Sequence, residues 1–150
     1  MLSAVVSALH VLALGIGLPA VFLRGRALKG RLDAAGLGRL FAADNVWGLA
    51  AVLWIATGLY RAFGGLEKGT AFYLGSHLFW TKLGLFGLLV GLEVWPMVTF
   101  IRWRRQLGRG QTPDVSRARA LHRVTHAEMA LVVIIVFVAA FMARGFGAAR

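Results

Sequence analysis

Four stretches of the chain are apolar along their whole length rather than on one face, and polar segments separate them. They cover about residues 2–23, 45–64, 75–101 and 124–146. A helix needs about 20 apolar residues to cross the hydrocarbon core of a bilayer, and each stretch is long enough. The pattern predicts an all-α fold, a four-transmembrane-helix bundle, in which residues 1–150 form a single domain.

Positive charges gather in two of the three connecting segments. They are Arg24, Arg26, Lys29, Arg31 and Arg39 after the first stretch, and Arg102, Arg104, Arg105, Arg109, Arg117, Arg119 and Arg123 after the third. The positive-inside rule therefore places these segments in the cytoplasm and both termini outside. We expect the arginines to face the anionic head groups of the lipid bilayer.

Composition agrees with a membrane protein. Hydrophobic residues make up 59% of the chain and the mean hydropathy is +0.72, whereas soluble domains average about half apolar. The net charge of +11 lies in membrane-flanking segments, so it does not indicate nucleic acid. The first stretch is long and ends in positive charge, as a retained helix does rather than a signal peptide.

Several kinds of chemistry have no support in the sequence. The chain has no cysteine, which excludes disulfides and iron–sulfur ligation. It also lacks a paired-carboxylate arrangement, a nucleophile elbow, a phosphate-binding glycine loop and an HExxH motif. Hydrolytic and nucleotide chemistry are therefore not expected.

Small residues recur at helical spacing in three of the apolar stretches and predict faces for close helix packing. The sets are Ser3, Ser7, His10 and Gly17; Asp44, Gly48, Ala51 and Gly58; and Gly84, Gly87 and Gly91. The segment before residue 44 reads as a short amphipathic helix at the membrane interface, and Asp44 or Asn45 as the N-cap of the second membrane helix.

The third stretch carries two charges, Lys82 and Glu93. Eleven residues place them about 20° apart around the helix but about 16 Å apart along its axis, so they cannot pair directly. Each needs a partner on another helix, a ligand or water.

One group of candidate site residues falls in the outer half of the bundle: His10, Arg61, Lys82 and His77. His10 and Lys82 lie at similar depths on the first and third stretches, and Arg61 is near the outer end of the second. Two cations and two imidazoles would suit an anionic ligand. The alternatives are snorkelling of Arg61 and Lys82 to the head groups and a hydrogen-bonded core role for His10.

A second group falls toward the cytoplasm: Asp44, Glu93, His122, His126 and Glu128. His122 and His126 are four apart and could share a metal, although two ligands make a weak site and solvation explains them as well. Glu93 could pair with a cation from the second or fourth helix, hold a proton, or belong to a proton relay.

The runs "ADNVWGLAAVLWIATGLYRAF", "EKGTAFYLGSHLFWTKLGLF" and "MARGFG" resemble a family of the bacterial inner membrane, domain of unknown function 2214. The likeness covers nearly the whole chain and implies a multi-pass protein of that membrane. The four-helix plan is more distantly similar to HemJ-type protoporphyrinogen IX oxidases and CopD-like copper proteins.

The HemJ resemblance implies a b-type haem bound through the histidine of "SALHVLAL", His10, with Lys82 of "WTKLGLF" at the matching position of the third helix. Imidazole is a normal axial ligand of haem iron, so His10 is also the candidate metal ligand. Lys82 or Arg61 would pair with the propionates, and His77 is a weaker second axial candidate. The scattered methionines make copper the weaker inference.

Three hypotheses follow. The first is a membrane protein that binds haem b or porphyrin for electron transfer or tetrapyrrole oxidation, which would make it an oxidoreductase. The second is a cofactor-free accessory or assembly subunit that joins other membrane subunits, or a second copy, through its glycine faces. The third is a small transporter or proton conductor that uses Lys82 and Glu93.

Overall fold

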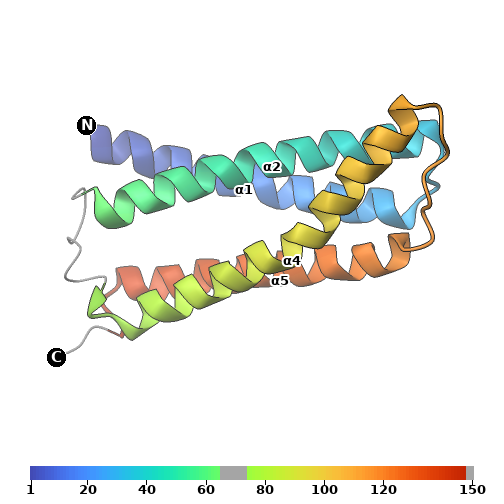
Figure 1. The fold of residues 1–150 in the computed structure, drawn as a ribbon. Coiled ribbons are helices and arrows are strands. Elements are labelled where there is room, and N and C mark those ends of the chain that lie inside the picture. The colour runs from blue at the N-terminus through green and yellow to red at the C-terminus, as the bar shows by residue number, and fades with distance from the viewer. Residues whose placement is uncertain (65–73, 148–150) are drawn as a thin grey trace.

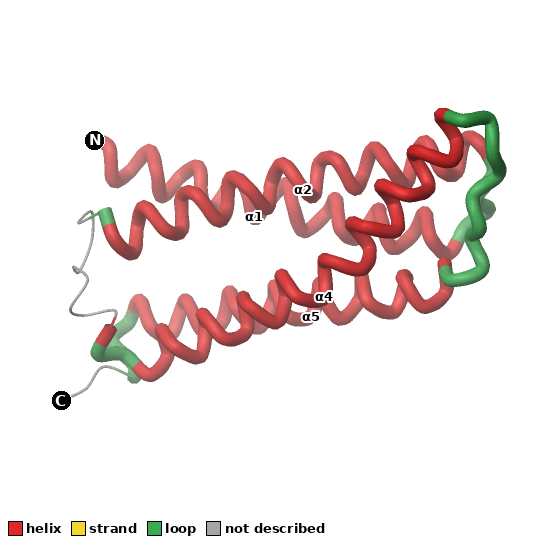
Figure 2. The backbone as a smooth tube through the Cα atoms, in the orientation of Figure 1, coloured by secondary structure: helices red, strands yellow, loops and turns green. Residues whose placement is uncertain are grey.

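The protein folds into four long helices (Figure 2) in a computed structural model that describes residues 1–64 and 74–147. They are α1 (Leu2–Lys29), α2 (Ala34–Phe63), α4 (His77–Gly108) and α5 (Ala118–Ala143). The shortest has 26 residues and the longest 32, so they are about 39 to 48 Å long, more than the roughly 30 Å of the hydrocarbon core. All four are apolar enough to span a membrane, which confirms the predicted four-helix bundle.

The chain begins and α5 ends at the same end of the bundle (Figure 1). We call this the terminal end. The opposite end carries Lys29, Arg31, Arg109 and Arg117, and we call it the basic end. The predicted placement of the basic end in the cytoplasm stays a prediction.

The second helix begins eleven residues earlier than the predicted start at residue 45. The side chain of Asp33 accepts a hydrogen bond of 2.9 Å from the backbone N–H of Gly36, and α2 then runs without a break through Asp44. The expected separate interfacial helix and the expected cap at Asp44 or Asn45 are therefore wrong. Asp33 already caps the helix and satisfies its first N–H groups. The helix therefore has no end between the expected interfacial segment and the membrane-spanning segment.

The helix α1 packs against α2 and α5, and α4 packs against α5. Gly17 brings α1 close to α2, because a Cβ atom there would lie 3.2 Å from the Cβ of Ala50 and 3.3 Å from the Trp47 ring. Ser3, Ser7 and His10 on the same face are half-buried. The small face predicted on the first helix is thus a packing face.

The glycines of α4 behave differently. No atom of another described helix lies within 4 Å of the Cβ position at Gly84, Gly87 or Gly91. The first half of α4 lies along α5, and its second half crosses toward α2 at the basic end (Figure 1). Pro96 lies between the two halves, where the missing N–H and the ring loosen the helix.

Three groups of buried apolar residues follow one another along the bundle. The terminal apolar cluster is Ala62, Phe79 and Met142. The central apolar cluster is Ala20, Val21, Trp47, Leu89, Val132 and Ile135. The basic-end apolar cluster is Leu28, Leu37, Leu40, Phe100, Trp103 and Leu121. Each helix contributes to the central and basic-end clusters, and the residues between those two positions carry the charges described next.

Candidate functional site

Arg24 lies at the centre of a buried ionic cluster. It stands on α1 between Val21 of the central apolar cluster and Leu28 of the basic-end apolar cluster, and its side chain is 0% exposed. A buried guanidinium must be paired, because the free energy of moving a bare charge out of water is prohibitive. Its partners come from all three other helices.

Each nitrogen at the tip of Arg24 contacts two carboxylates. Nη1 donates to Glu93 Oε1 on α4 at 2.8 Å and to Asp44 Oδ1 on α2 at 3.3 Å. Nη2 donates to Glu93 Oε2 at 3.1 Å and to Glu128 Oε2 on α5. The pair with Glu93 is bidentate, which is the geometry that a guanidinium favours with a carboxylate. The four helices therefore meet at one side chain.

Further donors complete the cluster. Trp47 donates its indole N–H to Glu93 Oε2 at 2.9 Å. Arg104, on the second half of α4, donates to Asp44 Oδ2 at 2.8 Å and to the Phe41 carbonyl at 3.3 Å. This second arginine ties α4 to α2 at the basic end. We refer to Arg24, Asp44, Glu93, Arg104 and Glu128 as the ionic cluster.

The charges of the ionic cluster do not balance. Asp44, Glu93 and Glu128 would carry three negative charges, and Arg24 and Arg104 carry two positive ones. Two buried polar atoms of the cluster, Arg24 Nε and Glu128 Oε1, have no hydrogen-bond partner among the described residues. Glu128 is 0% exposed, so its second oxygen lies in an environment where an unpaired negative charge is costly.

Sequence reasoning placed Arg24 wrongly. We expected it in a loop that faces lipid head groups, but α1 continues to Lys29 and buries it. Glu93 pairs with a cation from the first helix, not from the second or fourth. The missed signal was the count of charges: Glu93 and Glu128 lie within apolar stretches and Asp44 lies directly before one, and burying them requires a cation at a matching depth.

A polar line on α5 leads from the basic end to the ionic cluster. His122, Thr125 and Glu128 are three residues apart and share one helical face. The Nδ1 of His122 bonds the Gly25 carbonyl at 2.8 Å, and a carbonyl only accepts, so Nδ1 carries the proton. Thr125 is 0% exposed, and its hydroxyl oxygen has no hydrogen-bond partner among the described residues.

His126 does not join the ionic cluster. It is exposed, and its Nδ1 donates to the His122 carbonyl at 3.0 Å. The two imidazoles are 4.2 Å apart, but the described part of the chain contains no group of three residues that could hold a metal ion.

The other predicted group centres on His10, which packs against α2. Its Nδ1 is 2.8 Å from the hydroxyl oxygen of Thr57, and that hydroxyl donates to the Leu53 carbonyl at 2.6 Å. Because the single hydroxyl proton is used there, His10 Nδ1 is the donor and the imidazole lone pair is on Nε2. Trp54 stacks on the imidazole at 5.7 Å, and His10 Cε1 would lie 3.1 Å from a Cβ atom at Gly58.

The remaining residues of that group lie nearer the terminal end. Lys82 is half-buried, with its Nζ 5.6 Å from the centre of the Phe79 ring. Arg61, also half-buried, is one turn beyond Thr57 on α2. His77 is exposed at the start of α4, where its backbone N–H donates to the Gly147 carbonyl at 3.0 Å. Whether these residues hold a ligand with His10 stays a prediction.

Comparison with known proteins adds one finding. Residues 2–147 match the family described as "Predicted membrane protein (DUF2214)". The chain belongs to this family. No curated protein and no solved structure matches the chain. The match confirms the family resemblance and the assignment as a membrane protein.

In this DUF2214 protein the ionic cluster is the most completely built polar site among the described residues. Apolar clusters lie on both sides of it along the bundle axis, so its hydrogen bonds form in a medium of low dielectric. Such a site can hold the helices together, and it can bind and release a proton at the carboxylate that lacks a full set of donors.

Proposed function

We propose that this DUF2214 protein is a small proton-translocating membrane protein in which Glu128 binds and releases the proton. One observation carries the proposal: three carboxylates and two guanidinium groups share one layer of the bundle, where Arg24 and Glu128 are fully buried, and Glu128 Oε1 has no donor among the described residues. Ionisable groups inside a membrane domain are costly, and proton relays are a common reason for them.

The geometry favours a proton shared between Glu93 and Glu128. Both carboxylates contact the same nitrogen of Arg24, so their oxygens lie next to each other. Two ionised carboxylates that contact the same nitrogen atom repel each other, and a proton on one of them removes this repulsion. It also brings the charge of the ionic cluster to zero.

Protonation would also act on helix packing. Glu128 links α5 to α1 through Arg24, and an ionised carboxylate binds a guanidinium more strongly than a neutral one. Proton uptake would therefore weaken the attachment of α5 to α1 at this layer. Proton binding would thus be coupled to the packing of α5 against α1, and a proton carrier requires such a coupling.

The polar line on α5 is the route that we propose from the basic end. His122 lies at that end of the helix, and Thr125 is one turn from Glu128. A buried hydroxyl can pass a proton because it both donates and accepts. Apolar clusters lie on both sides of the ionic cluster along the bundle axis, so the polar face of α5 is the feature that favours exchange from the basic end.

The test is proton flux in liposomes. Purified protein would be reconstituted with an internal pH-sensitive dye, a pH gradient, and valinomycin with potassium to hold the membrane potential at zero. We expect wild-type protein to dissipate the gradient faster than empty liposomes, and Glu128→Gln to slow it at least about tenfold. The control is Asp114→Asn, which removes an exposed carboxylate outside the ionic cluster.

Two results would overturn this function. One is wild-type flux equal to that of empty liposomes in both gradient directions. The other is flux through Glu128→Gln equal to the wild-type value, with both proteins shown to be folded by circular dichroism.

A second candidate function follows from the tautomer of His10. A ligating histidine normally donates its other ring N–H to a fixed acceptor, and Thr57 fixes His10 Nδ1 in that way. We propose b-type haem or porphyrin as the ligand, with His10 Nε2 at the iron and Arg61 and Lys82 for the carboxylates. The donor chemistry fits such a group, which would supply one-electron chemistry.

The space beside Trp54, which stacks on His10, ranks this function second. The described cavity between α1 and α2, whose walls include Trp54 and Gly17, holds about 10 Å³, roughly one water. A flat macrocycle would fit there only if the helices that line this cavity moved apart. Protein expressed with ample haem should show a Soret band that His10→Ala removes and Ser7→Ala retains. A colourless wild-type protein would contradict it.

A further inference from the structure

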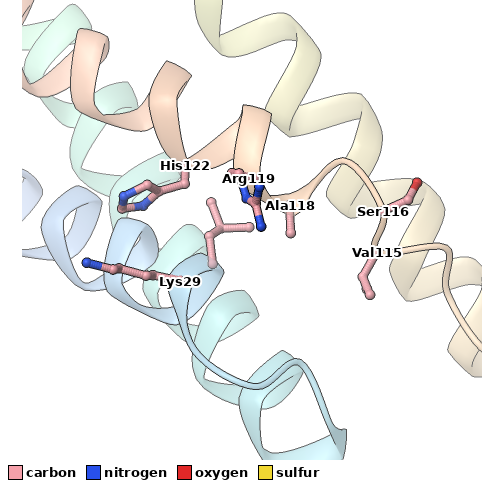
Figure 3. Close-up of a pocket in the computed structure, with 7 residues that line it drawn as sticks. Lys29, Val115, Ser116, Ala118, Arg119 and His122 are labelled. Carbon is pink, nitrogen blue, oxygen red and sulfur yellow. The ribbon is translucent and has the colours of Figure 1, made fainter.

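A cavity of about 810 Å³ opens at the basic end, between the end of α1 and the start of α5 (Figure 3). It is separate from the ionic cluster. Lys29 lines it from α1, and Arg119 and His122 line it from α5. Leu28, Val115 and Ala118 are the apolar residues of its lining, and Leu28 is part of the basic-end apolar cluster.

The charge of this cavity is one-sided. Lys29 and Arg119 carry fixed positive charges, and no carboxylate lines it among the described residues. The nearest acid in sequence, Asp114, accepts the Ser116 backbone N–H at 3.0 Å and so caps its own loop. Cations that line a concave surface without an acid raise the local concentration of anions.

The start of α5 adds to the positive potential. Arg117 at the N-cap position makes no side-chain capping bond, and no acidic residue lies in the first turn. The positive end of the helix dipole therefore meets the cavity without a side-chain counter-charge. The cavity thus combines two side-chain cations with a helix N-terminus.

We propose that this cavity binds the phosphate head group of an anionic phospholipid, with Lys29 and Arg119 at the phosphate. Three features select a lipid over a free phosphate ion. Three of the lining residues are apolar and suit the glycerol and the start of an acyl chain. The helices are longer than the hydrocarbon core, so their basic ends extend to the depth of the head groups. Basic pockets between membrane helices are known to hold such head groups.

The test compares two double variants of the full chain that lose the same charge. Lys29→Gln with Arg119→Gln removes the cations of the cavity. Arg26→Gln with Arg123→Gln removes exposed cations from the same two helices that do not line it. Delipidated protein in detergent would be titrated with dioleoyl phosphatidylglycerol or dioleoyl phosphatidylcholine and followed by native mass spectrometry.

We expect wild-type protein and the control variant to retain phosphatidylglycerol preferentially over phosphatidylcholine. The cavity variant should bind phosphatidylglycerol at least about tenfold more weakly. Equal binding by the two double variants would overturn the proposal, because the attraction would then be a diffuse effect of charge. Equal binding of the two lipids by wild-type protein would also overturn it.

A competition experiment distinguishes binding of the lipid from binding of a free phosphate compound. Inorganic phosphate or glycerol 3-phosphate at 1:1 with the lipid should leave phosphatidylglycerol bound. If inorganic phosphate displaces it at that ratio, the ligand is a soluble phosphate and the lipid assignment fails. Thermal unfolding of both double variants checks the fold, and none of these results depends on proton flux.

Discussion

Arg24 shows how one side chain can hold a charge away from water. Its guanidinium offers donors in a rigid fork, and three carboxylates from three helices accept them. A lysine could not make the bidentate pair with Glu93, because its ammonium is a point charge. The charge of Arg24 is therefore paired only when all four helices are in place, and Arg24 in turn helps to hold the four helices together.

Loss of the Arg24 charge should strongly destabilise the protein. In Arg24→Gln the buried Glu128 and the partly buried Asp44 and Glu93 would keep only Arg104 as a cation, and breaking a buried ion pair costs about 3–5 kcal/mol. We expect a large drop in the unfolding midpoint in detergent. Arg26→Gln, two residues away on the exposed side of α1, should leave the midpoint nearly unchanged.

A double variant separates charge from shape. Arg24→Gln combined with Glu128→Gln removes one charge of each sign from the ionic cluster. It should recover part of the stability lost in Arg24→Gln alone, because one fewer carboxylate is left unpaired. No recovery would show that the packing of the guanidinium matters more than its charge.

At the scale of the helices, glycines of the same type play two roles. Gly17 and Gly58 lie where another helix or side chain touches the Cβ position, so they set the distance between α1 and α2. Gly87 on α4 faces away from the described parts of the bundle. Spacing alone predicted both as packing faces, since periodicity identifies a face but not its neighbour.

Leucine substitutions should distinguish these roles. Gly17→Leu would drive a side chain into Ala50 and Trp47, and overpacking of this kind costs about 1–3 kcal/mol or more. Gly87→Leu meets nothing within 4 Å and should not lower the unfolding midpoint of the monomer. Size-exclusion chromatography of the same variant reports contact with another chain: a smaller assembly than wild type would place a subunit interface on this face.

At the scale of the whole molecule, charge sets the orientation and the ionic cluster sets the arrangement. Basic residues at one end predict that this end faces the cytoplasm. The ionic cluster joins α1, α2, α4 and α5 at a layer between two apolar clusters. These polar contacts fix the position of each helix along its neighbours. Apolar packing alone leaves this register less defined.

Orientation can be measured because the chain has no cysteine of its own. Gln111→Cys places an exposed thiol at the basic end, and Phe146→Cys places one at the terminal end. In intact cells a membrane-impermeant maleimide should label Phe146→Cys but label Gln111→Cys only after lysis. The opposite pattern would contradict the predicted topology.

The apolar stretches alone are enough to predict a four-helix membrane protein, because long apolar stretches have few stable alternatives to spanning helices. The sequence also marked Asp44, Glu93 and Glu128 as polar residues of the membrane domain, and Glu93 as a group in need of a partner. It did not reveal that Arg24 is their common partner, since the boundary of an apolar stretch is not the boundary of a helix. That pairing is visible only in the folded chain, because it depends on four side chains from four helices reaching the same depth and facing the same point.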